Sequence, residues 1–142
     1  MPAASPVVLD TNLGLDLLVF DDPACVALGE ALARSEVHWI ATEAMRDELS
    51  RVLGYPLIVT RLERTGRSAA GVLAAFDAQA RMLPAPAGAP CRCEDPDDQV
   101  FIDLAVAHRA HLLSKDRAVL ALRQALAERG VAVAARFEAP AG

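Results

Sequence analysis

Short apolar runs alternate along the chain with longer stretches in which apolar residues recur every three or four positions. Runs rich in β-branched and large apolar side chains predict buried strands at 7–9, 37–41 and 111–114, and a last short strand at 131–133. The periodic stretches predict helices at 13–20, 24–34, 42–53, 57–82, 101–108 and 118–129. Because strands that alternate with helices favour parallel pairing through right-handed crossovers, the pattern predicts an α/β fold with a parallel sheet.

The size of the chain suits one domain, which we expect to span residues 1–142. Hydrophobic residues make up 54% and aromatic residues only 4%, a composition typical of an aliphatic globular core rather than of a disordered chain. No apolar run approaches the roughly 20 residues of a membrane span, and the first residues lack the character of a signal peptide. A cytoplasmic location is therefore expected.

The net charge of −5 argues against a broad basic surface for nucleic acid. It does not exclude a nuclease, because a site built from carboxylates stays negative until cations fill it. Cys91 and Cys93 are spaced more closely than the usual cysteine pairs of zinc sites, and we expect both to be loop residues.

Two aspartates come directly after predicted strands. Asp10 follows the strand at 7–9, and Asp116 follows the strand at 111–114. Since the carboxyl ends of parallel strands meet at one edge of a sheet, where ligands of α/β proteins bind, both should lie at the same edge. A lone aspartate in this position is also a common helix cap or turn residue.

Two further acidic positions are directed toward the same place. Glu48 shares a helical stripe with Met45, Leu49 and Val52, and a carboxylate on an apolar stripe is costly unless it is paired or binds a cation. Asp98 opens the helix that leads into the Asp116 strand. Its neighbour Asp97 is an accessory candidate, and either residue can alternatively serve as a helix cap.

Carboxylates brought together in this way raise one another's pKa values, and a hard divalent cation relieves the repulsion. Mg²⁺ and Mn²⁺ both suit sites made of oxygen ligands. The chemistry that such a site supports is phosphodiester hydrolysis, in which a bound cation activates water and stabilises charge on the phosphate.

The motifs Asp10-Thr11-Asn12, the inward Glu48, Asp-Pro-Asp-Asp ending at Asp98, and Ser114-Lys115-Asp116 together resemble those of a PIN domain. More narrowly, the chain resembles the VapC-like toxins of toxin–antitoxin systems. The resemblance covers about residues 7–133. It implies a three-layer α/β/α sandwich with a central parallel β-sheet, Mg²⁺- or Mn²⁺-dependent endoribonuclease activity on RNA, a homodimer and a cognate antitoxin protein.

Carried over position by position, the resemblance implies that catalysis and metal binding rest on Asp10, Glu48, Asp98 and Asp116. Asn12, which can also cap the first helix, is expected to orient Asp10 or a water, and Ser114 occupies a place where the family has Thr or Ser near the site. The chain departs from the family in the proline-rich stretch at 83–90, which predicts a surface connection and leaves an edge strand there in doubt.

Substrate choice is expected to depend on surface shape and on arginines. With so few aromatic residues, no platform on which single-stranded bases could stack is visible in the sequence. The candidate arginines for contact with the RNA backbone are Arg46, Arg51, Arg61, Arg64 and Arg67. Some of them are alternatively a solvated helix face.

Two other functions stay open. The first is an aspartate-based phosphatase resembling the haloacid dehalogenases, which carry a second aspartate two residues after the first; Asn12 stands at that place and counts against this function. The second is a non-catalytic module that uses the same fold to bind RNA or protein. All four acidic positions are intact, which favours the enzyme.

Overall fold

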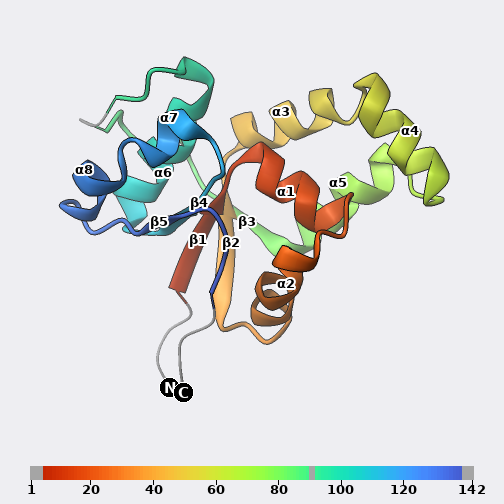
Figure 1. The fold of residues 1–142 in the computed structure, drawn as a ribbon, viewed down its shortest axis with the longest axis horizontal. Coiled ribbons are helices and arrows are strands. Elements are labelled where there is room, and N and C mark those ends of the chain that lie inside the picture. The colour runs from red at the N-terminus through yellow and green to blue at the C-terminus, as the bar shows by residue number, and fades with distance from the viewer. Residues whose placement is uncertain (1–4, 90–91, 139–142) are drawn as a thin grey trace.

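A computed structural model describes residues 5–89 and 92–138. Within these ranges, five parallel strands form one sheet in the order β3-β2-β1-β4-β5. The strands are β1 (Ser5–Leu9), β2 (Val37–Ala41), β3 (Ala80–Met82), β4 (His111–Leu113) and β5 (Val133–Ala134). Helices flank the sheet, so the prediction of an α/β/α sandwich with a central parallel sheet is confirmed (Figure 1).

The helices form two layers around the sheet. Figure 1 shows α6, α7 and α8 on one side and α1, α2 and α5 on the other. The α-helices are α1 (Thr11–Leu18), α2 (Val26–Ala33), α3 (Glu43–Val52), α4 (Pro56–Arg64), α5 (Ala69–Gln79), α6 (Gln99–His108), α7 (Arg117–Leu120) and α8 (Arg123–Ala127). Short 3₁₀ turns precede α2 at Pro23–Cys25 (η1) and α6 at Pro96–Asp98 (η2). None of the helices in the described ranges has the length and apolar character that crossing a bilayer requires.

The strand order contains a switch point at the centre of the sheet. From β1 the chain proceeds outward to β2 and β3, then crosses back to β4 on the other side of β1 and continues to β5. The register pairs Leu9 with Leu113, so β1 and β4 end side by side. In open parallel sheets, ligand crevices lie outside the carboxyl ends of strands at such a switch point. Asp10 and Asp116 follow these two strands, and the topology therefore brings them together.

Burial of the strands in the core explains why their sequences are runs of apolar residues. Val7, Val8 and Leu9 are all buried, as expected of a central strand with both faces covered. Trp39 of β2 packs edge-on against Phe76 of α5, with ring centroids 4.9 Å apart and planes at 83°. Such edge-to-face contacts are favourable for aromatic quadrupoles, and this contact fixes α5 to the sheet.

The first helix begins earlier than predicted. Asp10 occupies the N-cap position of α1, where its side chain accepts a hydrogen bond from the Leu13 N–H at 2.8 Å. Asn12 lies inside the first turn, so its prediction as the cap is wrong. A cap must have extended backbone, and the end of β1 provides it at Asp10, with φ −68° and ψ 170°.

Two predicted helices are also divided. The stretch at 57–82 forms α4 and α5, and its last residues, Ala80–Met82, pair with β2 as an edge strand instead of continuing the helix. The stretch at 118–129 forms α7 and α8. Since β3 precedes the prolines, residues 83–89 contain no strand, in agreement with the prediction of a surface connection. Cys93 lies in a loop, and Cys91 lies outside the described residues.

Candidate active site

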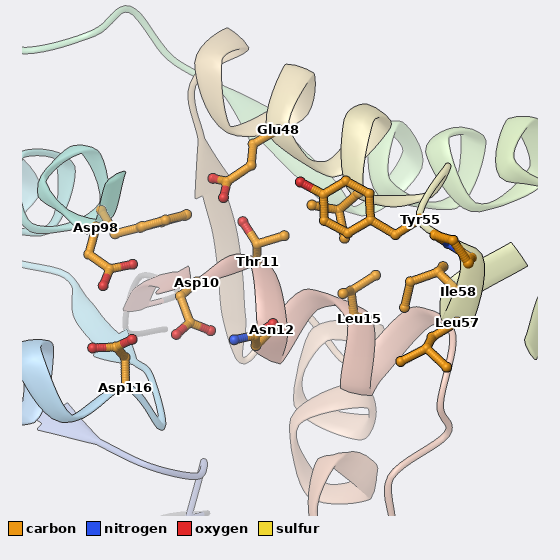
Figure 2. Close-up of a pocket in the computed structure, with 13 residues that line it drawn as sticks. Asp10, Thr11, Asn12, Leu15, Glu48, Tyr55, Leu57, Ile58, Asp98 and Asp116 are labelled. Carbon is orange, nitrogen blue, oxygen red and sulfur yellow. The ribbon is translucent and has the colours of Figure 1, made fainter. Parts of the chain in front are cut away.

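A cavity of about 590 Å³ opens at the switch point of the sheet. Its acidic end contains all four carboxylates singled out from the sequence, Asp10, Glu48, Asp98 and Asp116. Figure 2 shows the carboxylates of Asp10, Asp98 and Asp116 directed toward one another, with Glu48 extending toward them from α3. Apolar side chains from α1, α3 and α4 and the loop before α4 line the other end. The fold thus joins acidic residues from four distant stretches in one cavity.

Asp10 is the most deeply buried of the four, with 4% of its surface exposed. Its Oδ1 accepts the Leu13 N–H at 2.8 Å and its Oδ2 accepts the Ser114 hydroxyl at 2.5 Å. Burial raises the pKa of this carboxyl, and the two hydrogen bonds offset part of the rise because they favour the charged form. A carboxylate has about four lone-pair sites. Two donors therefore leave Asp10 with capacity for a cation.

Ser114 is completely buried and connects Asp10 to the Asp116 segment. Its hydroxyl donates to Asp10 Oδ2 and accepts the backbone N–H of Asp116 at 3.0 Å. The side chain of Asp116 in turn accepts the Ala118 N–H at 2.8 Å and caps α7. One oxygen of Asp116 is therefore held by the helix, and the carboxylate keeps a defined direction at the cavity.

Asp98 is held differently from the other aspartates. It occupies the N-cap position of α6, as the alternative interpretation expected, but its side chain makes no capping hydrogen bond there. Its Oδ2 is buried without a hydrogen-bond partner within the described residues. Burial is the main cause that raises the Asp98 pKa to about 7, and the charges of Asp116, Asp95, Asp10 and Glu48 add to the rise. A buried oxygen without a donor is costly, and a cation would satisfy it.

Asp95 is a candidate that the sequence reasoning missed. One carboxylate oxygen each of Asp95, Asp98 and Asp116 lie within 4.8 Å of one another, a group from which Asp10 and Glu48 are absent. The signal was the dense acidic turn at 94–98, but four acidic residues in five positions gave no means of choosing among them. Asp95 is exposed, and one of its oxygens accepts the Asp97 N–H at 2.9 Å, which caps η2.

The predicted accessory residues are placed differently from one another. Asn12 lines the cavity, and in Figure 2 its amide lies beside Asp10. Ser114 lies behind Asp10 and does not line the cavity. Asp97 is exposed and is not among the lining residues, so the structure does not bring it to the four carboxylates. Asp97 instead donates its backbone N–H to Asp95.

Three of the five candidate arginines are engaged within the chain. Arg46 makes a bidentate pair with Asp77, at 2.7 and 2.8 Å. Arg67 pairs with Asp21 at 2.7 Å and also donates to the backbone carbonyls at the C-terminal end of α1. Arg61 donates to a backbone carbonyl in the same region at 3.2 Å. Of the five candidate arginines, Arg51 and Arg64 are the two whose side chains make no such contact within the described ranges.

The donor set fits a hard divalent cation. The four acidic residues offer carboxylate oxygens, which Mg²⁺ and Mn²⁺ prefer over nitrogen and sulfur. The unpartnered Oδ2 of Asp98 and the raised pKa of Asp98 show that the carboxylates are not balanced by the protein's own donors. Since Mg²⁺ usually keeps several waters, carboxylates outside the tight group of three can contribute through them.

We expect the substitution Ser114→Ala to weaken cation binding roughly 10- to 100-fold, because loss of a group that orients a ligand typically has an effect of this size. The substitution leaves Asp10 Oδ2 without its buried donor, which should also lower the free energy of unfolding by about 1–3 kcal/mol. Calorimetric titration with Mn²⁺ measures the first effect and thermal unfolding the second. Ser114→Thr, which keeps the hydroxyl, is the matched control and should restore most of the affinity. Unchanged Mn²⁺ affinity in Ser114→Ala would contradict the positioning role.

Comparison with protein families matches residues 6–118 of the chain to the model described as "PIN domain". The matched segment begins in β1 and ends just after Asp116, so it contains all four carboxylates of the acidic end. No curated protein matches the chain. PIN domains are generally metal-dependent nucleases.

Proposed function

Because the chain belongs to the PIN domain family, we propose that it is a Mg²⁺- or Mn²⁺-dependent endoribonuclease and the toxin of a toxin–antitoxin pair. The observation that carries the nuclease assignment is the buried, unpartnered Oδ2 of Asp98 among carboxylates at the switch point of the sheet. The toxin assignment rests on the resemblance of the acidic motifs to those of VapC-like toxins. A homodimer and a cognate antitoxin belong to the same proposal and rest on that resemblance.

In this proposal Asp10, Asp98 and Asp116 hold the cation, and Asp95 is an additional candidate ligand. When bound, the cation supplies a more acidic water and offsets the negative charge that develops on the phosphate. Glu48 is half-buried and extends from α3 toward the aspartates (Figure 2). In this proposal it accepts a hydrogen bond from the attacking water and directs it at phosphorus. Asn12 donates from its amide to the water or the phosphate.

The chain's remaining residues act by orientation. Ser114 holds Asp10, and the N–H of Ala118 holds Asp116, so that both carboxylates keep their direction during the reaction. Contact with the RNA backbone is proposed for the exposed Arg51 and Arg64. Arg46, Arg61 and Arg67 would have to leave their present partners to make it.

The direct test is incubation of the purified chain with a mixed RNA pool in Mg²⁺, in Mn²⁺ and in EDTA. Internal cleavage that requires the cation and is lost in Asp10→Asn is the expected result. Cation and RNA binding without cleavage would favour the non-catalytic module, and cleavage of phosphomonoesters but not RNA would favour the phosphatase. Growth arrest on expression in cells, relieved by co-expression of a neighbouring gene product, tests the toxin assignment separately.

A further inference from the structure

Tyr55 is an exposed aromatic side chain at the apolar end of the cavity. It stands immediately before α4, and 49% of its surface is exposed. Its backbone is fixed on both sides, since its N–H donates to Val52 at 2.9 Å and its carbonyl accepts the Val59 N–H at 2.9 Å. Pro56 follows and opens α4. Within the described residues, the phenol makes no hydrogen bond, so the backbone at Tyr55 is fixed while the ring itself is left open.

The surroundings of the ring are apolar and continuous with the acidic end. Leu15, Leu57 and Ile58 line this part of the cavity, and Leu57 is 83% exposed. Figure 2 shows Tyr55 and these side chains on one side of the cavity and the aspartates on the other, with Thr11 and Asn12 between them. Leu15 and Ile58 are buried and form the floor of this end, whereas Leu57 and Tyr55 are left open. Exposed apolar side chains that adjoin a cavity commonly mark a binding site.

The two ends together define the chemistry of the ligand. The acidic end can take an anion only through a bound cation, and no lysine or arginine of the described residues lines the cavity. The other end offers a flat ring and aliphatic side chains. A nucleotide of RNA has this character, with a phosphate beside a planar base, and about 590 Å³ lies within the usual range of ligand sites. A peptide would satisfy the apolar end but provides no phosphate for the other.

We propose that Tyr55 is a stacking platform for a nucleobase next to the scissile phosphate. The inference rests on the proposed nuclease function and names the residue that would hold the base. A base that stacks on Tyr55 has to leave its neighbours in a helix, as single-stranded loops and ends allow and duplexes do not. Sequence reasoning showed no platform because only six aromatics are spread along the chain. The fold places two of them at the cavity, Phe101, which is buried, and Tyr55, which is exposed.

The first experiment measures stacking without cleavage. Single-stranded oligoribonucleotides carrying 2-aminopurine at one position at a time are titrated with the full chain in Ca²⁺. Stacking quenches 2-aminopurine, so we expect strong quenching at one or two neighbouring positions, retained in Tyr55→Phe and lost in Tyr55→Ala. Val59→Ala, a truncation on α4 outside the cavity, is the matched control and should quench like the unmodified chain. The inference would be overturned if Tyr55→Ala and the unmodified chain quenched equally. It would also be overturned if neither protein quenched 2-aminopurine at any position.

The second experiment measures cleavage of single-stranded RNA in Mg²⁺. Removing an aromatic that stacks on a base typically costs enough binding energy for an effect of about tenfold, which we expect in kcat/KM for Tyr55→Ala. The effect should disappear on RNA with an abasic residue at the quenched position, and a loss of equal size on both substrates would overturn the stacking role. Quenching without cleavage by the unmodified chain would refute the nuclease and leave the base site standing. Cleavage without quenching would support the nuclease and refute the base site at Tyr55.

Discussion

The substitution Asp98→Asn should lower cation-dependent RNA cleavage about a thousandfold, because a bound cation contributes several kcal/mol to the transition state and each 1.36 kcal/mol is a factor of ten. The amide has nearly the same volume, but it removes the charge that would attract the cation. The Asp98 side chain makes no capping hydrogen bond, so the fold should persist. Without cation, the thermal stability of Asp98→Asn should even be slightly higher than that of the unmodified chain. The substitution removes a carboxylate whose charged form is disfavoured by burial and by neighbouring aspartates.

The adjacent residue provides the control. Asp97→Asn makes the same chemical change one position earlier, on an exposed side chain outside the cavity. It should change kcat/KM by less than about threefold, since surface charges away from a site have small effects. Equal losses in the two variants would mean that the acidic turn attracts cations diffusely, without Asp98 as a specific ligand. Steady-state cleavage of a single labelled RNA at several Mg²⁺ concentrations distinguishes these results.

The second large effect is on stability, and it couples pH to the cation. In the absence of cation, the pKa of Asp98 is about 7 in the folded chain and near its ordinary value of 3.8 when unfolded. The folded chain therefore holds a proton that the unfolded chain releases. The resulting stabilisation is fully present below about pH 3.8 and is lost as pH rises through 7. We expect the melting temperature of the cation-free chain to contain a component that falls between pH 5 and pH 8.

Addition of Mg²⁺ at pH 8 should reverse this loss. A ligand that binds only the folded state stabilises it by about 2.7 kcal/mol at a hundred times its Kd. Thermal unfolding at pH 5 and pH 8, with EDTA or with Mg²⁺ at matched ionic strength, measures both effects. Other carboxylates also titrate, so the difference between the unmodified chain and Asp98→Asn isolates the contribution of this residue. An identical pH slope in both proteins, or an equal Mg²⁺ response, would refute the assignment of Asp98.

Much of the acidic end could be predicted from the sequence because it depends on local patterns. Runs of β-branched residues identify the central strands, and a carboxylate directly after such a run must lie at the edge of a parallel sheet. This reasoning placed Asp10 and Asp116 without knowledge of the strand order. Helical periodicity placed Glu48 on an inward face, since the period of 3.6 residues is a property of the helix itself. Whether these residues bind a cation stays a prediction.

Other features depend on contacts between distant segments, which a local pattern does not contain. Ala80–Met82 continue a helical pattern, yet they form a strand because the edge of β2 offers unpaired backbone groups. Arg46 and Arg67 were open candidates for RNA contact, and the structure pairs them with aspartates more than 30 residues away.

The sequence by itself determined the class of fold and the acidic character of the site, because both follow from periodicity and from the geometry of parallel strands. Only the tertiary structure decided how that site is completed. It placed Ser114 between Asp10 and Asp116, left an oxygen of Asp98 without a donor, and brought Asp95 close to Asp98 and Asp116. It also set Tyr55 in the same cavity. These relations are distances between side chains from separate elements, and they exist only once the sheet and its helices have packed.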